Sequence, residues 1–82
     1  MVKLYTKPAC PDCRKTKASF KKNGIQYEEI DLSTSQEALE TIKQQGFLSA
    51  PVVITDNDSW AGFLPDRISA LANEVGEDIW AI

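Results

Sequence analysis

Short apolar runs and helix-spaced apolar stripes alternate along the chain, and turn-forming residues separate them. The first run, residues 2–6, indicates a strand. Residues 11–22 are expected to form a helix, because Pro11 suits the first helical position and Asn23–Gly24 suits the C-terminal cap. Partly alternating apolar positions over residues 25–32 predict a second strand.

The middle of the chain predicts a second helix followed by two more strands. Overlapping capping-box patterns over residues 33–37 predict a second helix, which Gly46 is expected to end. A β-branched run over residues 52–55 predicts the next strand, because such side chains favour a pleated, half-buried surface. The polar residues 56–58 should turn that strand back into a short partner at residues 59–61, which gives a hairpin.

The last stretch predicts a third helix that begins at Pro65, followed after Gly76 by a short tail that carries Ile79 and Trp80. The order of elements is therefore β-α-β-α-β-β-α. A strand–helix–strand unit implies a parallel pair with a right-handed crossover, and the last two strands form an antiparallel hairpin. We expect a single α/β domain over residues 1–82, with a thioredoxin-like four-stranded mixed sheet and three helices.

Composition agrees with a folded domain and gives no sign of membrane insertion. The chain has 82 residues, and 43% of them are hydrophobic, which is enough for a globular core. No apolar run approaches the ~20 residues that span a bilayer. Residues 1–6 are too short an apolar stretch for a signal peptide and lack its cleavage pattern. We therefore expect a cytoplasmic protein, in a compartment that keeps thiols reduced.

Charge is unevenly distributed along the chain, although the net charge is only −3. Seven of the nine Lys and Arg residues lie in the first 22 positions, and eleven of the twelve Asp and Glu residues lie from Glu28 onward. One interpretation is a solvated basic helix face. The other is a basic rim beside a reactive site, which attracts an acidic partner. The acidic composition and the lack of a suitable aromatic motif disfavour nucleic-acid binding.

The candidate chemistry lies in the two cysteines, Cys10 and Cys13, since the chain has no histidine for Cys-His catalysis. Their Cys-x-x-Cys spacing, at the start of the first helix of a β-α-β unit, strongly indicates a redox pair. Unpaired N–H groups and the positive end of the helix dipole would stabilise a thiolate at Cys10. This thiolate would attack a substrate disulfide. Cys13, one turn later, would then resolve the mixed disulfide and leave the pair oxidised.

Other interpretations of the cysteine pair are open at this point. A dimer could share a zinc ion between two such pairs, or the cysteines could simply fill space. A non-catalytic module that binds its partner according to redox state is a further alternative. The carboxylate of Asp12, which lies between the cysteines, opposes a second negative charge there. Lys7, Arg14 and Lys15 could offset this effect. We expect no metal and no bound cofactor beyond the redox-active disulfide.

The dipeptide Ala50–Pro51 is the second candidate element of a site. Its simplest interpretation is an entry signal for the strand that follows, because proline is tolerated at the start of a strand. In the expected fold, the peptide bond would instead be cis and would face Cys10. The segment before it would then offer backbone hydrogen bonds to an extended substrate.

Several segments together resemble the glutaredoxin group of thioredoxin-like proteins. They are Tyr5-Thr6-Lys7, Cys10-Pro11-Asp12-Cys13 and Ala50-Pro51-Val52-Val53. The segment Trp60-Ala61-Gly62-Phe63-Leu64-Pro65-Asp66 is similar to the Trp-Ser-Gly-Phe-x-Pro-Asp motif of NrdH-redoxins, and Gln45-Gly46-Phe47 fits the same family. The resemblance covers nearly the whole chain and implies a glutaredoxin-type fold.

The resemblance to NrdH-redoxins implies an electron carrier with thioredoxin-like behaviour. Such proteins take electrons from thioredoxin reductase, pass them to class Ib ribonucleotide reductase and use glutathione poorly. By this resemblance Cys10 is the nucleophile, Cys13 resolves the mixed disulfide, and Pro51 is the cis-proline. The residues expected to bind substrate or partner are Lys7, Pro11, Asp12, Ala50, Pro51, Trp60, Gly62 and Phe63, and Pro65 and Asp66 are expected to be structural. A monomer is expected, since a carrier must visit two partners.

Two positions depart from the NrdH-redoxin pattern. That family commonly has Val or Met after the first cysteine and Gln before the second, where this chain has Pro11 and Asp12. Cys-Pro-x-Cys is closer to a glutathione-dependent glutaredoxin, which is the alternative function. Residues 10–20 also resemble the arsenate reductase and Spx group, but those chains are longer and fit the motif at residues 60–66 poorly.

Overall fold

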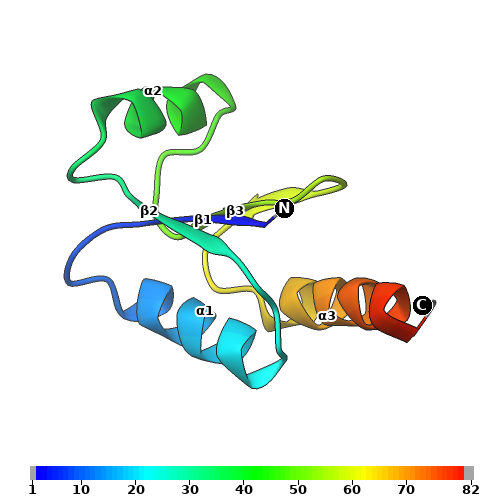
Figure 1. The fold of residues 1–82 in the computed structure, drawn as a ribbon. Coiled ribbons are helices and arrows are strands. Elements are labelled where there is room, and N and C mark those ends of the chain that lie inside the picture. The colour runs from blue at the N-terminus through cyan, green and yellow to red at the C-terminus, as the bar shows by residue number, and fades with distance from the viewer. Residues whose placement is uncertain (1, 81–82) are drawn as a thin grey trace.

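The computed structural model describes residues 2–80, with side chains as far as Asn73, and it has three layers (Figure 1). One helix covers one face of a central sheet, and the other two helices cover the opposite face. The elements are β1 (Lys3–Thr6), α1 (Pro11–Lys22), β2 (Glu28–Asp31), α2 (Gln36–Gln44), β3 (Val52–Ile54), β4 (Ser59–Ala61) and α3 (Pro65–Trp80). The predicted order of elements is confirmed.

The sheet has the strand order β2-β1-β3-β4 and is mixed, as expected. β1 runs parallel to β2, with Leu4 opposite Glu29, and antiparallel to β3, with Leu4 opposite Val53. β3 and β4 form the predicted hairpin, in which Val53 lies opposite Trp60. Because β1 is a central strand, the loop that follows it leaves the middle of the sheet, and this loop carries the first cysteine.

Successive side chains of β1 enter two separate cores, because a strand directs alternate residues to opposite faces. Leu4 packs with Phe20 of α1 and Ile68 of α3. The next residue, Tyr5, packs with Ile42 of α2. The strand is therefore held from both sides, which fixes the position of the loop at its C-terminal end.

β2 is shorter than the strand predicted over residues 25–32, because Ile25 is part of the C-terminal capping motif of α1. Gly24 has a φ of +68°, and its N–H donates to the carbonyl of Lys21 at 3.2 Å. The N–H of Ile25 donates to the carbonyl of Phe20 at 2.9 Å. These two bonds form a Schellman motif, whose last residue packs back onto the helix. Ile25 is accordingly a core residue of the helix end.

Local capping also fixes both ends of α2. The Ser35 hydroxyl accepts the N–H of Ala38 at 3.2 Å, within the predicted capping segment. At the other end, Gly46 has a φ of +88°, and the N–H of Phe47 donates to the carbonyl of Ile42 at 3.0 Å. This second Schellman arrangement holds the chain against α2 as it leaves toward β3.

The prediction of a short tail after Gly76 is wrong, because α3 continues through this glycine to Trp80. Glycine costs a helix roughly 1 kcal/mol relative to alanine but does not have to end it. The side chains of Ile79 and Trp80 lie outside the described part of the chain. Among the described residues, no helix combines the length and apolar character needed to cross a membrane.

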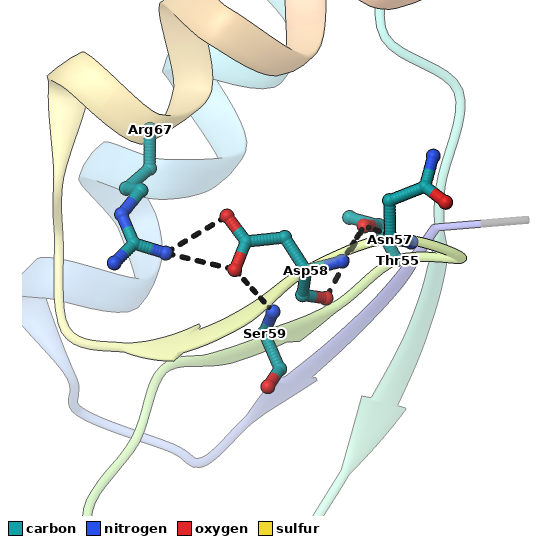
Figure 2. A network of polar contacts seen from close by, with 5 residues as sticks. All are labelled: Thr55, Asn57, Asp58, Ser59 and Arg67. Carbon is teal, nitrogen blue, oxygen red and sulfur yellow. Dashed lines mark hydrogen bonds and ion pairs between the residues drawn. The ribbon is translucent and has the colours of Figure 1, made fainter.

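A polar network joins the β3–β4 turn to the start of α3 (Figure 2). The Thr55 hydroxyl accepts the backbone N–H of Asn57 at 3.2 Å and of Asp58 at 2.9 Å. The Asp58 carboxylate accepts the N–H of Ser59 at 2.8 Å, and one terminal nitrogen of Arg67 donates to both its oxygens at 2.9 and 2.8 Å. The hairpin is thus tied to α3, away from the cysteines.

Candidate functional site

The first cysteine occupies the N-cap of α1. Ala9 has a φ of +56° in the loop that reverses the chain after β1. Cys10 then has extended backbone angles of −110° and 105°, and its sulfur accepts the backbone N–H of Cys13 at 3.1 Å. A sulfur at this position lies beside unpaired helix N–H groups and the positive end of the helix dipole. The predicted environment for a thiolate is therefore present.

The second cysteine lies in the first turn of α1 and is bonded to the first. Cys10 and Cys13 form a disulfide, with their Cα atoms 5.2 Å apart. Cys10 is 8% exposed and Cys13 is 2% exposed. Cys10 is therefore the more exposed of the two cysteines.

The segment before β3 lies against the Cys10 sulfur. The Ala50–Pro51 peptide bond is cis, as expected, and the Ala50 carbonyl oxygen lies 4.0 Å from Cys10 Sγ. The Pro51 carbonyl accepts the N–H of Gly62 at 2.7 Å, which holds the loop after β4 beside this segment. Residues 50–51, residue 62 and the Cys10 loop are thus brought together, although they are far apart in the sequence.

An apolar groove of about 350 Å³ opens beside this junction, between α2 and the chain that leads to Pro51. Leu48 projects from its rim with 87% of its surface exposed. The lining residues are Lys7, Pro8, Leu32, Ser33, Leu39, Ile42, Lys43, Phe47, Leu48, Ser49 and Ala50. Neither cysteine lines this groove, but Ala50 lines it and also lies against the Cys10 sulfur, so the groove begins one residue from the disulfide.

A second, polar cavity of about 320 Å³ lies on the β2 side of the cysteines. The buried Thr6 hydroxyl donates to Glu29 Oε2 at 3.0 Å, and Lys17 Nζ lies 3.3 Å from the same oxygen. Hydrogen bonds from the Ser33 hydroxyl and the Ser33 N–H lower the pKa of the Asp31 carboxyl below its ordinary value. This wall is therefore anionic in part, in contrast to the apolar groove.

A model of the glutaredoxin family matches residues 2–60 of the chain, and both cysteines lie inside the match. The chain belongs to the glutaredoxin family. This glutaredoxin is 39% identical to the glutaredoxin-like protein NrdH of Escherichia coli (strain K12) over 70 residues, which cover 85% of this chain and 86% of that protein. It is 32% identical to NrdH of Lactococcus lactis subsp. lactis (strain IL1403) over 72 residues, with 88% and 100% covered.

A solved structure gives the same result. NrdH-redoxin from Escherichia coli matches this glutaredoxin with a TM-score of 0.83 and 38% identity, over 85% of this chain and 92% of that one. The thioredoxin-like fold and the similarity to NrdH proteins predicted from the sequence are confirmed. The protein is therefore a thiol–disulfide oxidoreductase, with Cys10–Cys13 as its redox-active disulfide.

The remaining sequence-predicted site residues of this glutaredoxin lie at different depths. Lys7 is exposed and lines both cavities, and Pro11 and Asp12 are exposed in the first turn of α1. Phe63 is half-buried against the core. Pro65 and Asp66 are exposed where α3 begins.

Trp60 is a core residue of this glutaredoxin. It is 4% exposed and packs with Val53 and Ile68. The Arg67 guanidinium covers its ring, 5.9 Å from the centroid. Its indole nitrogen is buried and has no hydrogen-bond partner among the described residues.

Sequence reasoning missed two parts of this glutaredoxin's site. Phe47 and Leu48 form one side of the apolar groove, and their only signal is a pair of apolar residues in a connecting loop. The sequence pattern gives no sign of the Thr6–Glu29 hydrogen bond, because this bond depends on the pairing of β1 with β2. No cluster of three or more potential metal ligands occurs in the part of the chain that the structure describes.

Proposed function

We propose that this glutaredoxin is a protein-disulfide reductase that carries electrons from thioredoxin reductase to class Ib ribonucleotide reductase. The observation that supports it most is the apolar groove beside Cys10, which suits a protein segment better than the charged tripeptide glutathione. The similar protein from Escherichia coli is described as having a thioredoxin-like activity profile, which agrees with this assignment. We further propose a single cytoplasmic domain over residues 1–82 that acts as a monomer.

The reaction is a pair of thiol–disulfide exchanges. The Cys10 thiolate attacks one sulfur of the substrate disulfide, and the other substrate sulfur leaves as a thiolate that takes a proton from solvent. Cys13 loses its proton and attacks Cys10 Sγ, which breaks the mixed disulfide and releases the second substrate thiol. The substrate gains two electrons, and the Cys10–Cys13 pair becomes the disulfide seen in the structure.

The backbone beside the cis-proline is suited to hold the substrate. The N–H groups of Ser49 and Ala50 donate to no backbone carbonyl among the described residues. An extended substrate can pair with them as an added strand. We assign a structural role to Pro65 and Asp66. We assign substrate or partner binding to Lys7, Pro11, Asp12, Ala50, Pro51, Trp60, Gly62 and Phe63. Because Trp60 is buried, it would support this surface from the core.

A glutathione-dependent glutaredoxin is the second candidate, because Pro11 follows Cys10 as in Cys-Pro-x-Cys glutaredoxins. The ammonium group of Lys7 at the groove could receive a glutathione carboxylate. This candidate predicts that a Cys13→Ser variant keeps monothiol deglutathionylation activity, since removal of glutathione from a protein needs only the nucleophile.

The electron donor distinguishes the two candidates. In an NADPH-coupled assay with a protein disulfide as acceptor, thioredoxin reductase is expected to support a rate about tenfold or more above that with glutathione and glutathione reductase, because the preferred donor docks by its surface. A Cys10→Ser protein serves as the control for uncoupled NADPH oxidation. Turnover with glutathione alone, together with an active Cys13→Ser variant in deglutathionylation, would replace the proposed function with the second candidate.

A further inference from the structure

We propose that the groove between α2 and residues 47–50 selects protein substrates in which the reactive cysteine has an apolar side chain two residues away and a carboxylate beyond it. This inference rests on the proposed function and specifies its substrate class. The juxtaposition that carries it is an apolar groove with a positive rim, joined to Cys10 through Ala50.

The position of the groove determines which part of a substrate it meets. The Ala50 carbonyl lies 4.0 Å from Cys10 Sγ, and the same residue lines the groove. A substrate sulfur at Cys10 therefore places the neighbouring residues of its chain along residues 48–50. In an extended segment, residues two apart point to the same face. The side chain two residues from the substrate cysteine is then directed into the groove.

The inner surface of the groove is apolar and in part exposed. Leu39 and Phe47 are half-buried, Ile42 is buried, and Leu48 exposes 87% of its surface at the rim. Among the described residues, the large hydrophobic side chains that are exposed are Leu48 and Leu64. An apolar substrate side chain would cover this surface and remove it from water.

The charges at the rim are all of one sign. Lys7 and Lys43 are exposed and line the groove, and no carboxylate lines it. The polar cavity on the other side of the cysteines has charges of both signs, because Glu29 and Asp31 line it together with Lys7, Arg14 and Lys17. Its lining therefore lacks the uniformly positive charge of the groove. Positive charge at the groove is also opposite in sign to the net charge of −3. A carboxylate beyond the apolar residue would meet the two lysines, and a substrate lysine would be repelled.

Symmetric peptides test this selection whichever way the chain runs along residues 48–50. The probe is the disulfide-linked dimer of acetyl-Glu-Leu-Gly-Cys-Gly-Leu-Glu-amide, compared with dimers in which lysine replaces both glutamates or glycine replaces both leucines. Reduced protein is mixed with each dimer at low salt, and the released peptide thiol is quantified by chromatography. One protein dithiol becomes a disulfide for every two peptide thiols released. The Glu-Leu dimer is expected to react about tenfold faster than the lysine dimer, and the difference should shrink as salt is added.

Two variants connect that preference to the groove. Lys43→Glu should remove most of the advantage of the glutamate dimer, whereas Lys22→Glu, with the same charge change at the far end of α1, should keep it. Leu48→Ser should slow the leucine dimers about threefold or more and leave the glycine dimer unchanged, because only the former cover this side chain. Circular dichroism checks that both groove variants are folded.

The outcomes separate this inference from the function on which it rests. Equal rates for all dimers, or a glutamate preference that survives Lys43→Glu, would overturn the groove selection while leaving disulfide reduction intact. Failure to reduce any dimer, with the dithiol shown to be intact by mass spectrometry, would contradict the proposed protein-disulfide reductase itself.

Discussion

Replacing Cys10 with serine is expected to reduce the rate of insulin disulfide reduction to the uncatalysed background. A serine hydroxyl is not ionised near neutral pH, so the nucleophile at the N-cap of α1 is lost. The other sulfur cannot substitute for it, because Cys13 is only 2% exposed. The measurement is the lag and slope of insulin precipitation with dithiothreitol as donor, in wild type and variant at equal concentration.

The control for this result is a replacement that leaves both cysteines in place. Lys22→Ala changes an exposed side chain at the opposite end of the same helix and should keep the wild-type rate. A Cys10→Ser protein with more than about one tenth of the wild-type rate, from material free of wild-type protein, would show that another group carries the exchange.

Replacing Phe20 with alanine is expected to lower the free energy of unfolding by about 3–5 kcal/mol, since it removes a large buried side chain and leaves a cavity. Phe20 is fully buried, packs with Leu4 and Ile68, and contacts the Tyr27 ring edge-to-face at 5.1 Å between centroids. A domain of this size has roughly 5–15 kcal/mol in total, so the loss is a large share of the free energy of unfolding. Urea denaturation followed by circular dichroism measures the change.

The matched control is Lys21→Ala, an exposed neighbour on α1, which should change the free energy of unfolding by no more than about 0.5 kcal/mol. If Phe20→Ala cost less than about 1 kcal/mol, the packing of α1 against β1 and α3 would be wrong. Such a result would also contradict the conclusion that this packing holds β1, and with it the loop of Cys10, in a fixed position.

The sequence was most informative where the signal is local. Pro11, Asn23 and Gly24 predict both ends of α1, and the structure places the helix at Pro11–Lys22. Because Cys10 directly precedes this start, its N-cap position follows from the same local rules. The chemistry of the pair could therefore be predicted without any knowledge of tertiary structure.

Features that depend on tertiary contacts were missed or misjudged. Ile25 has a strand-like pattern around it, but the Schellman motif at the end of α1 takes it into the core. The apolar groove combines residues near Lys7, on α2 and around Leu48, and no local pattern links these three segments. Gly76 predicts an end to the last helix, because glycine is a poor helix former. The free-energy cost of one glycine is too small to end α3, which continues to Trp80.

The central claim is that Cys10 attacks the substrate and Cys13 resolves the product, and covalent trapping tests it most directly. Cys13→Ser protein is reduced, incubated with a disulfide-linked peptide dimer and analysed by intact mass and tryptic mass spectrometry without reductant. The expected result is a stable adduct of one peptide per protein, joined at Cys10, where wild type releases two peptide thiols and forms no lasting adduct. A Cys13→Ser protein that forms no adduct, or a Cys10→Ser protein that forms one at Cys13 equally fast, would contradict it.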